Sequence, residues 1–230
     1  MYIYGKNPVR EAIYAKRKIN ELYLDDKFND FKFINFLEEN KIEFKYLNKG
    51  ELNNLTNNGI HQGIVAKVED YKIKNLMEVL DTSKRQRFLI LDELSDPHNL
   101  GAIIRTAEAT NLDGIIMSNR NQVPLTGVVA KVSSGAIEHV NIITVSNINQ
   151  AIMKLKENNV WVIGTDGSAD KDYTEIPKDL SVAIVMGNEG SGIRPLVKRN
   201  CDILVKIPMY GKVNSLNVSV AAALILYASL

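Results

Sequence analysis

The chain has few of the residues that build disulfides and metal centres. Its 230 residues include one cysteine, Cys201, and three histidines, His61, His98 and His139, that lie far apart. One cysteine excludes an intramolecular disulfide and favours a reducing cytosol. We expect it to be a small, partly buried residue before a strand. The histidines lack the paired spacing of zinc ligands, so no metal site is predicted.

The chain also lacks long apolar runs and a marked excess of one charge. The longest weakly polar run, residues 218–230, is shorter than the roughly 20 residues that span a bilayer. Residues 1–13 contain no apolar signal segment, so neither export nor membrane insertion is expected. The formal net charge of +1 argues against nucleic-acid binding through bulk charge. Any such binding site must be local.

Hydrophobic residues make up 45% of the chain and charged residues 24%, which is typical of a globular protein with a buried core. From residue 86 to residue 230, continuous apolar runs alternate with helical patterns. This alternation predicts an α/β domain whose parallel sheet is covered on both faces. Residues 1–70 are expected to form a smaller α/β unit, and residues 71–85 a linker that is weakly helical at 76–80.

Apolar periodicity and turn residues give the expected elements. Short strands are expected between the second helix and residue 68. The predicted strands are 21–24, 63–68, 88–91, 114–117, 140–145, 160–163, 182–186 and 203–207. The predicted helices are 8–15, 31–40, 100–110, 128–134, 148–158, 195–200 and a last one that begins at 215.

The candidate site lies in residues 184–223, where two strand exits and a helix start fall close together. The first strand ends in a glycine-rich loop with Gly187, Gly190 and Gly192, and the last helix begins near Ser215 and Asn217. Ligands bind at the carboxyl ends of parallel strands because loop amides and helix N-termini converge there. Neither the Walker A pattern nor the dinucleotide fingerprint fits. A purely structural role for the glycines in turns remains an alternative.

Two further groups of polar residues have either a structural or a functional role. Asn99 is suitable as the N-cap of the helix after the strand 88–91, and Arg105 lies two turns into it, where Glu108 offers a surface ion pair. Basic residues gather near the N-terminus, where they form either a solvated helix end or a patch that contacts phosphates. These residues are Lys6, Arg10, Lys16, Arg17 and Lys18.

Three segments resemble the SpoU (TrmH-like) branch of the SPOUT RNA methyltransferases, in that family's order and spacing. They are Asn99-x5-Arg105-Thr106-Ala107, MGNEGSGI at 186–193, and IPMYGKVNSLNVSVAAA at 207–223. The likeness extends over about 85–230. GKNPVREAI near the N-terminus, GIHQGIVA and KVSSGAIEHVNI resemble the subgroup that methylates the 2′-hydroxyl of a guanosine in 23S ribosomal RNA.

The resemblance implies S-adenosylmethionine as the methyl donor, a homodimer, and a C-terminal deep trefoil knot. It also implies that the N-terminal domain resembles a ribosomal RNA-binding protein and binds the RNA substrate. The positions that the family uses for the cofactor fall on Gly164, Thr165, Asp166, Met186, Gly187, Ile207, Leu216 and Asn217.

The resemblance also implies catalytic roles for Arg105, Asn99, Glu189, Ser215 and Asn217. A guanidinium is a poor base in its usual charged state, so we expect Arg105 to stabilise developing oxyanion charge or to hold a phosphate. Asn99 would orient Arg105 or the ribose, and Glu189 would hold the loop or an arginine. Ser215 and Asn217 would cap the last helix and also face the RNA.

Two alternatives to a 23S rRNA guanosine 2′-O-methyltransferase remain. One is a relative that methylates the ribose of tRNA, which the folded N-terminal domain disfavours. The other is an RNA-binding ribosome assembly factor without turnover, which the presence of Arg105 and the asparagines disfavours. RNA binding through the basic residues would weaken steeply with salt.

Overall fold

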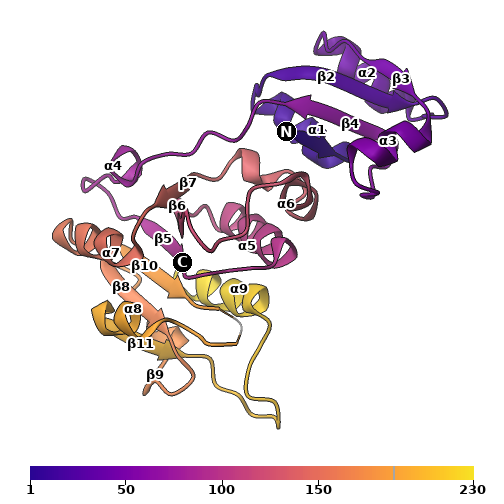
Figure 1. Ribbon diagram of the computed structural model, residues 1–230. Helices are drawn as coiled ribbons and strands as arrows, with labels where there is room; N and C mark the ends of the chain where they lie inside the picture. Colours follow the sequence, from indigo (N-terminus) through magenta and orange to yellow (C-terminus); the bar gives the residue numbers. More distant parts are fainter. Residues whose placement is uncertain (189) are drawn as a thin grey trace. The chain divides into compact units, whose positions relative to one another are not determined.

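The computed structural model describes residues 1–188 and 190–230, and the chain forms two compact units (Figure 1). The first unit comprises residues 1–71 together with 124–139, and the second comprises 72–123 together with 140–230. The chain therefore returns to the first unit after it has begun the second.

The first unit has a four-stranded sheet in the order β1-β4-β2-β3. β4 runs antiparallel to both β1 and β2, while β2 and β3 are parallel. Its strands are β1 (Tyr2–Tyr4), β2 (Ile19–Asp25), β3 (Lys45–Leu47) and β4 (Ile64–Val68). Its helices are α1 (Lys6–Tyr14), α2 (Phe31–Glu39), α3 (Lys49–Leu55), α6 (Gly127–Val132) and the short 3-10 helix η1 (Ala136–Glu138).

The segment that contains α6 packs closely against the N-terminal residues. A Cβ atom on Gly127 would lie 2.5 Å from the carbonyl oxygen of Tyr2, so only glycine permits this approach. Lys131 Nζ donates to Gln62 Oε1 at 2.6 Å, and burial lowers the pKa of Lys131. The segments around Gln62 and Lys131 thus pack against each other within the first unit.

The second unit contains a seven-stranded sheet in the order β7-β6-β5-β10-β8-β11-β9, and every pair is parallel. The predicted α/β class with a parallel sheet is confirmed. Its strands are β5 (Arg87–Leu91), β6 (Gly114–Ser118), β7 (Ile142–Val145), β8 (Trp161–Thr165), β9 (Lys171–Asp172), β10 (Val182–Met186) and β11 (Ile203–Lys206). Its helices are α4 (Leu76–Val79), α5 (Pro97–Ala109), α7 (Ile148–Glu157), η2 (Tyr173–Glu175), α8 (Pro195–Asn200) and α9 (Val218–Ala228).

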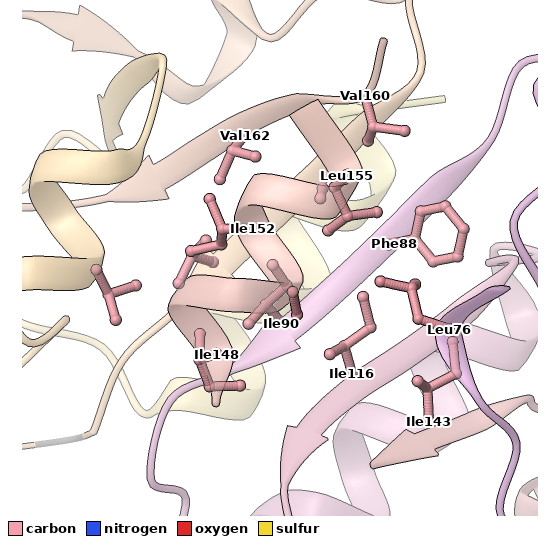
Figure 2. Packing of buried hydrophobic residues seen from close by; sticks show 14 of the residues in the cluster. Leu76, Phe88, Ile90, Ile116, Ile143, Ile148, Ile152, Leu155, Val160 and Val162 are labelled. Carbon is pink, nitrogen blue, oxygen red and sulfur yellow. The ribbon is translucent and has the colours of Figure 1, made fainter. Parts of the chain in front are cut away.

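Helices cover both faces of this sheet, as the continuous apolar strands require. On one face, strand residues such as Ile90 and Ile116 pack against Ile152 and Leu155 of α7 (Figure 2). Alternate strand residues are also fully buried and point to the opposite face, where Figure 1 places α5 and α9. The rigid core thereby fixes the strand ends from which the site loops emerge.

Several local expectations are wrong. Residues 49–55 form the helix α3, where only short strands were expected between residues 40 and 68. Asn48 accepts from Glu51 N at 3.0 Å, and Glu51 accepts from Asn48 N at 3.0 Å. This capping box is readable in the sequence. The strands β1 and β9 were not predicted, and each has at most three residues.

Among the described residues, no helix has the length and apolar character needed to cross a bilayer.

Candidate active site at the carboxyl edge of the parallel sheet

The two central strands of the second unit, β5 and β10, lie side by side, and the chain leaves them toward opposite edges of the sheet. Their exit loops are joined by hydrogen bonds. Asp92 N donates to Met186 O at 2.9 Å, and Asn188 Nδ2 donates to Glu93 O at 2.9 Å. Such a switch point opens a crevice at the carboxyl ends of the strands, which is the usual ligand position in open α/β sheets.

An ion pair between the buried carboxylate of Asp92 and the partly exposed Arg194 fixes the same two loops. The Asp92 side chain is fully buried, and Arg194 contacts it through the backbone N at 3.1 Å, Nε at 2.8 Å and a terminal nitrogen at 2.6 Å. Hydrogen bonding to Asp92 raises the pKa of the Arg194 guanidinium. Arg194 also contacts Glu93 at 3.1 Å, and Glu93 has a positive φ of 66°, which is unusual for a non-glycine residue. The contacts hold this loop in its strained conformation.

A pocket of about 190 Å³ lies at this edge. It is formed by the loops after β8, β10 and β11 and by the segment before α9. Its lining includes Thr165, Asp166, Met186, Gly187, Asn188, Ile207, Asn214, Ser215 and Leu216. The volume is below the range of about 300–1,000 Å³ typical of ligand pockets, and Met209 and Leu216 at its rim are exposed to solvent. The pocket is therefore an open cleft. A larger cavity of about 390 Å³ lies elsewhere, against α4, β7 and α7.

The glycine-rich loop closes tightly on itself. Asn188 and Gly192 exchange two backbone hydrogen bonds of 3.1 and 2.9 Å. A Cβ atom on Gly187 would lie 2.0 Å from the carbonyl carbon of Gly192, so no side chain fits there. Gly164, one of the expected cofactor positions, packs against Cys201 and is not among the pocket residues. Glu189, an expected catalytic residue, lies outside the described residues.

The last helix begins later than expected. The N-cap of α9 is Asn217, whose side chain accepts from Ser219 N at 3.0 Å, so the predicted start at Ser215 is wrong. Ser215 instead lines the pocket, in the segment between β11 and α9. Asn217 Nδ2 also donates to Asn99 Oδ1 at 3.0 Å. The structure thus brings two of the expected catalytic residues together from distant parts of the chain.

Helix α5 carries the other predicted residues. It begins at Pro97 with Asp96 as its N-cap, because the Asp96 side chain accepts from His98 N at 2.8 Å and proline is favourable in the first turn. The expectation that Asn99 is the N-cap is therefore wrong. Arg105 is exposed, and in the described part of the chain it forms no ion pair or hydrogen bond, including the one considered with Glu108. It does not line the pocket.

One acidic residue of the pocket is an ionised carboxylate that is paired with a lysine. Asp166 forms an ion pair of 2.6 Å with Lys198 and accepts hydrogen bonds from Ser168. The hydrogen bonds from Lys198 and Ser168 lower the pKa of Asp166 to about 2. The carboxylate stays ionised at neutral pH and can accept hydrogen bonds from a ligand's hydroxyl or ammonium groups.

The five basic residues considered for RNA binding have different environments. Arg17 is mostly buried and pairs with the buried Glu138 at 2.7 Å, and it donates to Glu69 O. Its guanidinium lies 3.7 Å from the centre of the Tyr71 ring. Lys18 pairs with Glu69 at the surface, and Lys16 is exposed. Lys6 and Arg10 lie on α1 and contact aromatic rings, and Lys6 also pairs with Asp30.

The cysteine and one histidine have structural roles. Cys201 Sγ donates to Val197 O at 3.3 Å, and burial raises its pKa to about 12, so its thiol is inert at neutral pH. His61 is buried and accepts a hydrogen bond from Gly63 N, while burial lowers its pKa. Across residues 1–188 and 190–230, no three His, Cys, Asp or Glu side chains gather in a way that could hold a metal ion.

The sequence reasoning missed Asp92, Arg194 and Asn214. Asp92 directly follows a fully buried strand, and a carboxylate at that position was a usable signal of a role at the sheet edge. No local pattern pointed to Arg194, because its partner lies 102 residues away.

The fold and the pocket define a class: a parallel α/β protein with helices on both faces of its sheet and a cleft at the carboxyl ends of its strands. The model of the SpoU rRNA Methylase family matches residues 86–227, and a model for RNA 2′-O ribose methyltransferase substrate binding matches residues 2–74. The chain belongs to the SpoU rRNA Methylase family and is an RNA methyltransferase.

Relatives with curated names agree. A putative TrmH family tRNA/rRNA methyltransferase, YacO of Bacillus subtilis, is 41% identical over 98% of this chain and 93% of its own length. A putative TrmH family tRNA/rRNA methyltransferase of Staphylococcus aureus is 43% identical over the same shares. The SpoU methyltransferase AviRb of Streptomyces viridochromogenes, solved with AdoMet, has a TM-score of 0.84 at 22% identity and covers 100% of this chain and 88% of its own. That likeness shows the shared fold.

Proposed function

We propose that this enzyme transfers the methyl group of S-adenosylmethionine to the ribose 2′-hydroxyl of a guanosine in 23S ribosomal RNA. Membership of the SpoU family supports the RNA 2′-O-methyltransferase activity. The observation that carries the assignment to specific residues is the cleft formed by the loops after β8, β10 and β11, beside which Asn99 and Asn217 are hydrogen-bonded.

The pocket residues suit S-adenosylmethionine. Met186, Ile207 and Leu216 offer apolar surface for an adenine ring, and backbone groups at the strand ends offer hydrogen bonds to its edge. The ionised Asp166 suits ribose hydroxyls or the ammonium group. Thr165 lines the same side, but its hydroxyl donates to Val185 O at 3.0 Å and so serves to hold the loop. The bound cofactor would supply an electrophilic methyl group.

The chain's own residues then position the nucleophile. Attack by a ribose hydroxyl must be in line, so catalysis depends mainly on orientation of the two substrates. Asn99 and Asn217 are proposed to orient the ribose, with Ser215 at the pocket wall. Arg105, exposed on α5, is proposed to stabilise developing oxyanion charge, since a charged guanidinium is a good donor and a poor base. Glu189 is proposed to hold the glycine-rich loop.

The choice of ribosomal RNA rests on the N-terminal residues. They match a model for substrate binding by RNA 2′-O ribose methyltransferases, and we propose that residues 1–70 bind RNA while residues 86–230 carry out the transfer. The relatives bear names that include both tRNA and rRNA, so tRNA is the competing substrate. Both substrates and the single cysteine suit a cytoplasmic enzyme.

We also propose a homodimer. Val220, Leu224 and Tyr227 are exposed by 49%, 38% and 55%, and their spacing places them on one face of α9. An exposed apolar stripe on a helix usually marks an interface. Leu224→Glu is expected to halve the mass measured by light scattering. An unchanged mass in the variant, or a monomeric parent protein, would contradict this assignment.

The test of function measures labelled methyl transfer to unmodified 23S rRNA and, in parallel, to unmodified tRNA. Label on a single 23S guanosine ribose is expected. Label on tRNA alone would keep the chemistry and replace the substrate. With the preferred RNA, Arg105→Ala is expected to lower kcat by about 100-fold, a typical loss for one stabilising donor. Arg105→Lys retaining most of the turnover would contradict a role that depends on guanidinium geometry.

A further inference from the structure

The first unit carries a row of cations and aromatic rings that the proposed transfer reaction does not use. Lys6, Arg10 and Tyr14 of α1 follow one another at intervals of four residues, so they form one stripe on the helix, about 12 Å long between the first and last Cα atoms. None of the three belongs to the buried face of α1, which consists of Pro8, Val9, Ala12 and Ile13.

Aromatic rings from the segment that contains α2 meet this stripe. Lys6 Nζ lies 5.5 Å from the centre of the Phe28 ring. The Arg10 guanidinium lies 5.4 Å from the centre of Phe33 and 5.9 Å from that of Phe36. These distances are within the range of cation–π attraction. The rings therefore hold both cations in place.

The stripe ends in an aromatic pair that reaches solvent. Tyr14 and Phe36 meet edge to face, with centroids 5.4 Å apart, and Phe36 is 5.6 Å from Phe33. Tyr14 is 58% exposed although it has an apolar ring, and Phe36 is half-buried. We call the side chains of Lys6, Arg10, Tyr14, Phe28, Phe33 and Phe36 the aromatic face.

The two cations of the aromatic face, Lys6 and Arg10, differ in whether a carboxylate of the protein already pairs with them. Lys6 is paired with Asp30 at 2.6 Å. Among the residues that the structure describes, Arg10 forms no ion pair. The pKa of Asp30 is lowered mainly by its hydrogen bond to Lys6, and the charge of Arg10 adds a smaller effect. A guanidinium that contacts aromatic rings by cation–π attraction can still donate its N–H groups to an external acceptor, and phosphate matches its fork geometry.

We propose that the aromatic face binds unpaired nucleotides of the RNA substrate, with Arg10 on a phosphate and the rings of Tyr14 and Phe36 against bases. This inference rests on the proposed function, because it takes RNA as the substrate. Bases in a duplex are stacked on each other and offer no free ring faces, whereas loop and bulge nucleotides stack on protein aromatics. The exposed ring of Tyr14 and the guanidinium of Arg10 should therefore bind single-stranded segments more tightly than a duplex.

The experiment compares binding by the full-length protein to two fluorescent RNAs with equal numbers of phosphates, one a hairpin with a large loop and one a blunt duplex. The parent protein is expected to prefer the hairpin. Tyr14→Ala should weaken hairpin binding about 5- to 150-fold, the range for loss of one stacking contact, and leave duplex binding nearly unchanged. Arg10→Ala removes the phosphate contact of the aromatic face and should also weaken hairpin binding. Arg10→Lys keeps the charge and should recover only part of the affinity.

Matched controls separate this face from general charge and folding. Tyr46→Ala removes another exposed tyrosine of the first unit, 54% exposed on β3, and should leave hairpin binding unchanged. Lys18→Ala removes an exposed lysine that is not on the face. S-adenosylmethionine affinity should be equal in all variants, and for active RNA the Tyr14 change should raise KM without lowering kcat.

The outcomes distinguish the two proposals. Equal losses of Tyr14→Ala on hairpin and duplex, or Tyr14 and Arg10 variants that bind and methylate like the parent, would overturn the aromatic face while methyl transfer stands. Selective loss of hairpin binding without any methyl transfer by the parent would support the face and reject the proposed reaction. If the parent protein binds neither RNA, the proposal for the aromatic face is rejected. The same holds if the parent binds a protein partner through this face and no RNA.

Discussion

The two units use opposite means to build a binding surface. In the second unit, the pocket is made of strand ends, glycines and main-chain groups, with one ionised carboxylate. In the first unit, the surface consists of large side chains, and five of the six phenylalanines of the chain fall between Phe28 and Phe44. A small cofactor can be recognised by a rigid backbone, whereas single-stranded RNA is bound by aromatic rings that stack on bases and by cations that contact phosphates.

The largest effect on stability should come from the buried ion pair of the first unit. Arg17→Ala leaves Glu138 buried without its partner, and burial already raises the pKa of that carboxyl. We expect a loss of about 3–5 kcal/mol. Hydrogen exchange measured by mass spectrometry should show the loss in the first unit. Lys18→Ala, which breaks an exposed pair with Glu69, should cost at most about 1 kcal/mol. Equal effects of the two variants would contradict this.

A substitution in the glycine-rich loop tests whether main-chain groups shape the cofactor pocket. Gly187→Ala introduces a Cβ atom 2.0 Å from the carbonyl carbon of Gly192, so the loop must move. Displacement by about 1 Å can cost on the order of 100-fold in rate. Calorimetric titration with S-adenosylmethionine and the transfer assay should both show the loss. Gly190→Ala is the control, since its nearest neighbour would be 3.7 Å away. An active Gly187→Ala enzyme would refute the backbone description.

Two substitutions at Asn217 can distinguish its role as the N-cap of α9 from its proposed role in catalysis. Asn217→Ala removes the cap of α9 and should cost about 1 kcal/mol of stability. Asn217→Asp keeps an oxygen that accepts from Ser219 N but loses the amide donor to Asn99 Oδ1. It should therefore unfold like the parent and turn over about tenfold more slowly, the loss expected for a hydrogen bond of about 1.4 kcal/mol. Parallel losses of stability and activity in both variants would assign Asn217 to the cap alone.

The smallest expected effect is the pH dependence that His61 gives to the stability of the first unit. Burial lowers the pKa of His61 in the folded protein, so the unfolded chain binds a proton more readily. The contribution of neutral His61 is complete above about pH 6.5 and is lost as the pH falls below it. Hydrogen exchange between pH 7.5 and 5.5 should show the first unit weakening. His61→Gln should flatten this dependence, and an unchanged slope would contradict the assignment.

The sequence was most informative where local pattern and burial agree. The strands Phe88 to Leu91 and Val182 to Met186 were predicted within a residue, because continuous apolar runs leave few alternatives in a parallel sheet. The start of α9 was misplaced because Ser215 and Asn217 both suit an N-cap, and only the path of the chain along the pocket decides between them.

Contacts between distant residues could not be read from local pattern. Nothing near Arg17 in sequence indicates that Glu138 lies beside it, so a basic cluster could not be divided into buried and available members. The same holds for Arg10, whose aromatic neighbours Phe33 and Phe36 lie on another helix. The sequence showed the four-residue spacing along α1, but it did not show that α2 packs beside it.

The long separations within the pocket have a consequence for synthesis of the chain. Asn188 joins Glu93 across 95 residues, and Asn217 joins Asn99 across 118. Closing loops of this length costs entropy and slows folding. A nascent chain that has emerged only through α7 therefore carries Asn99 and Arg105 but has none of the strands that shape the cofactor pocket. The methyl donor can therefore bind only after the segments up to α9 have been synthesised, because they complete the pocket.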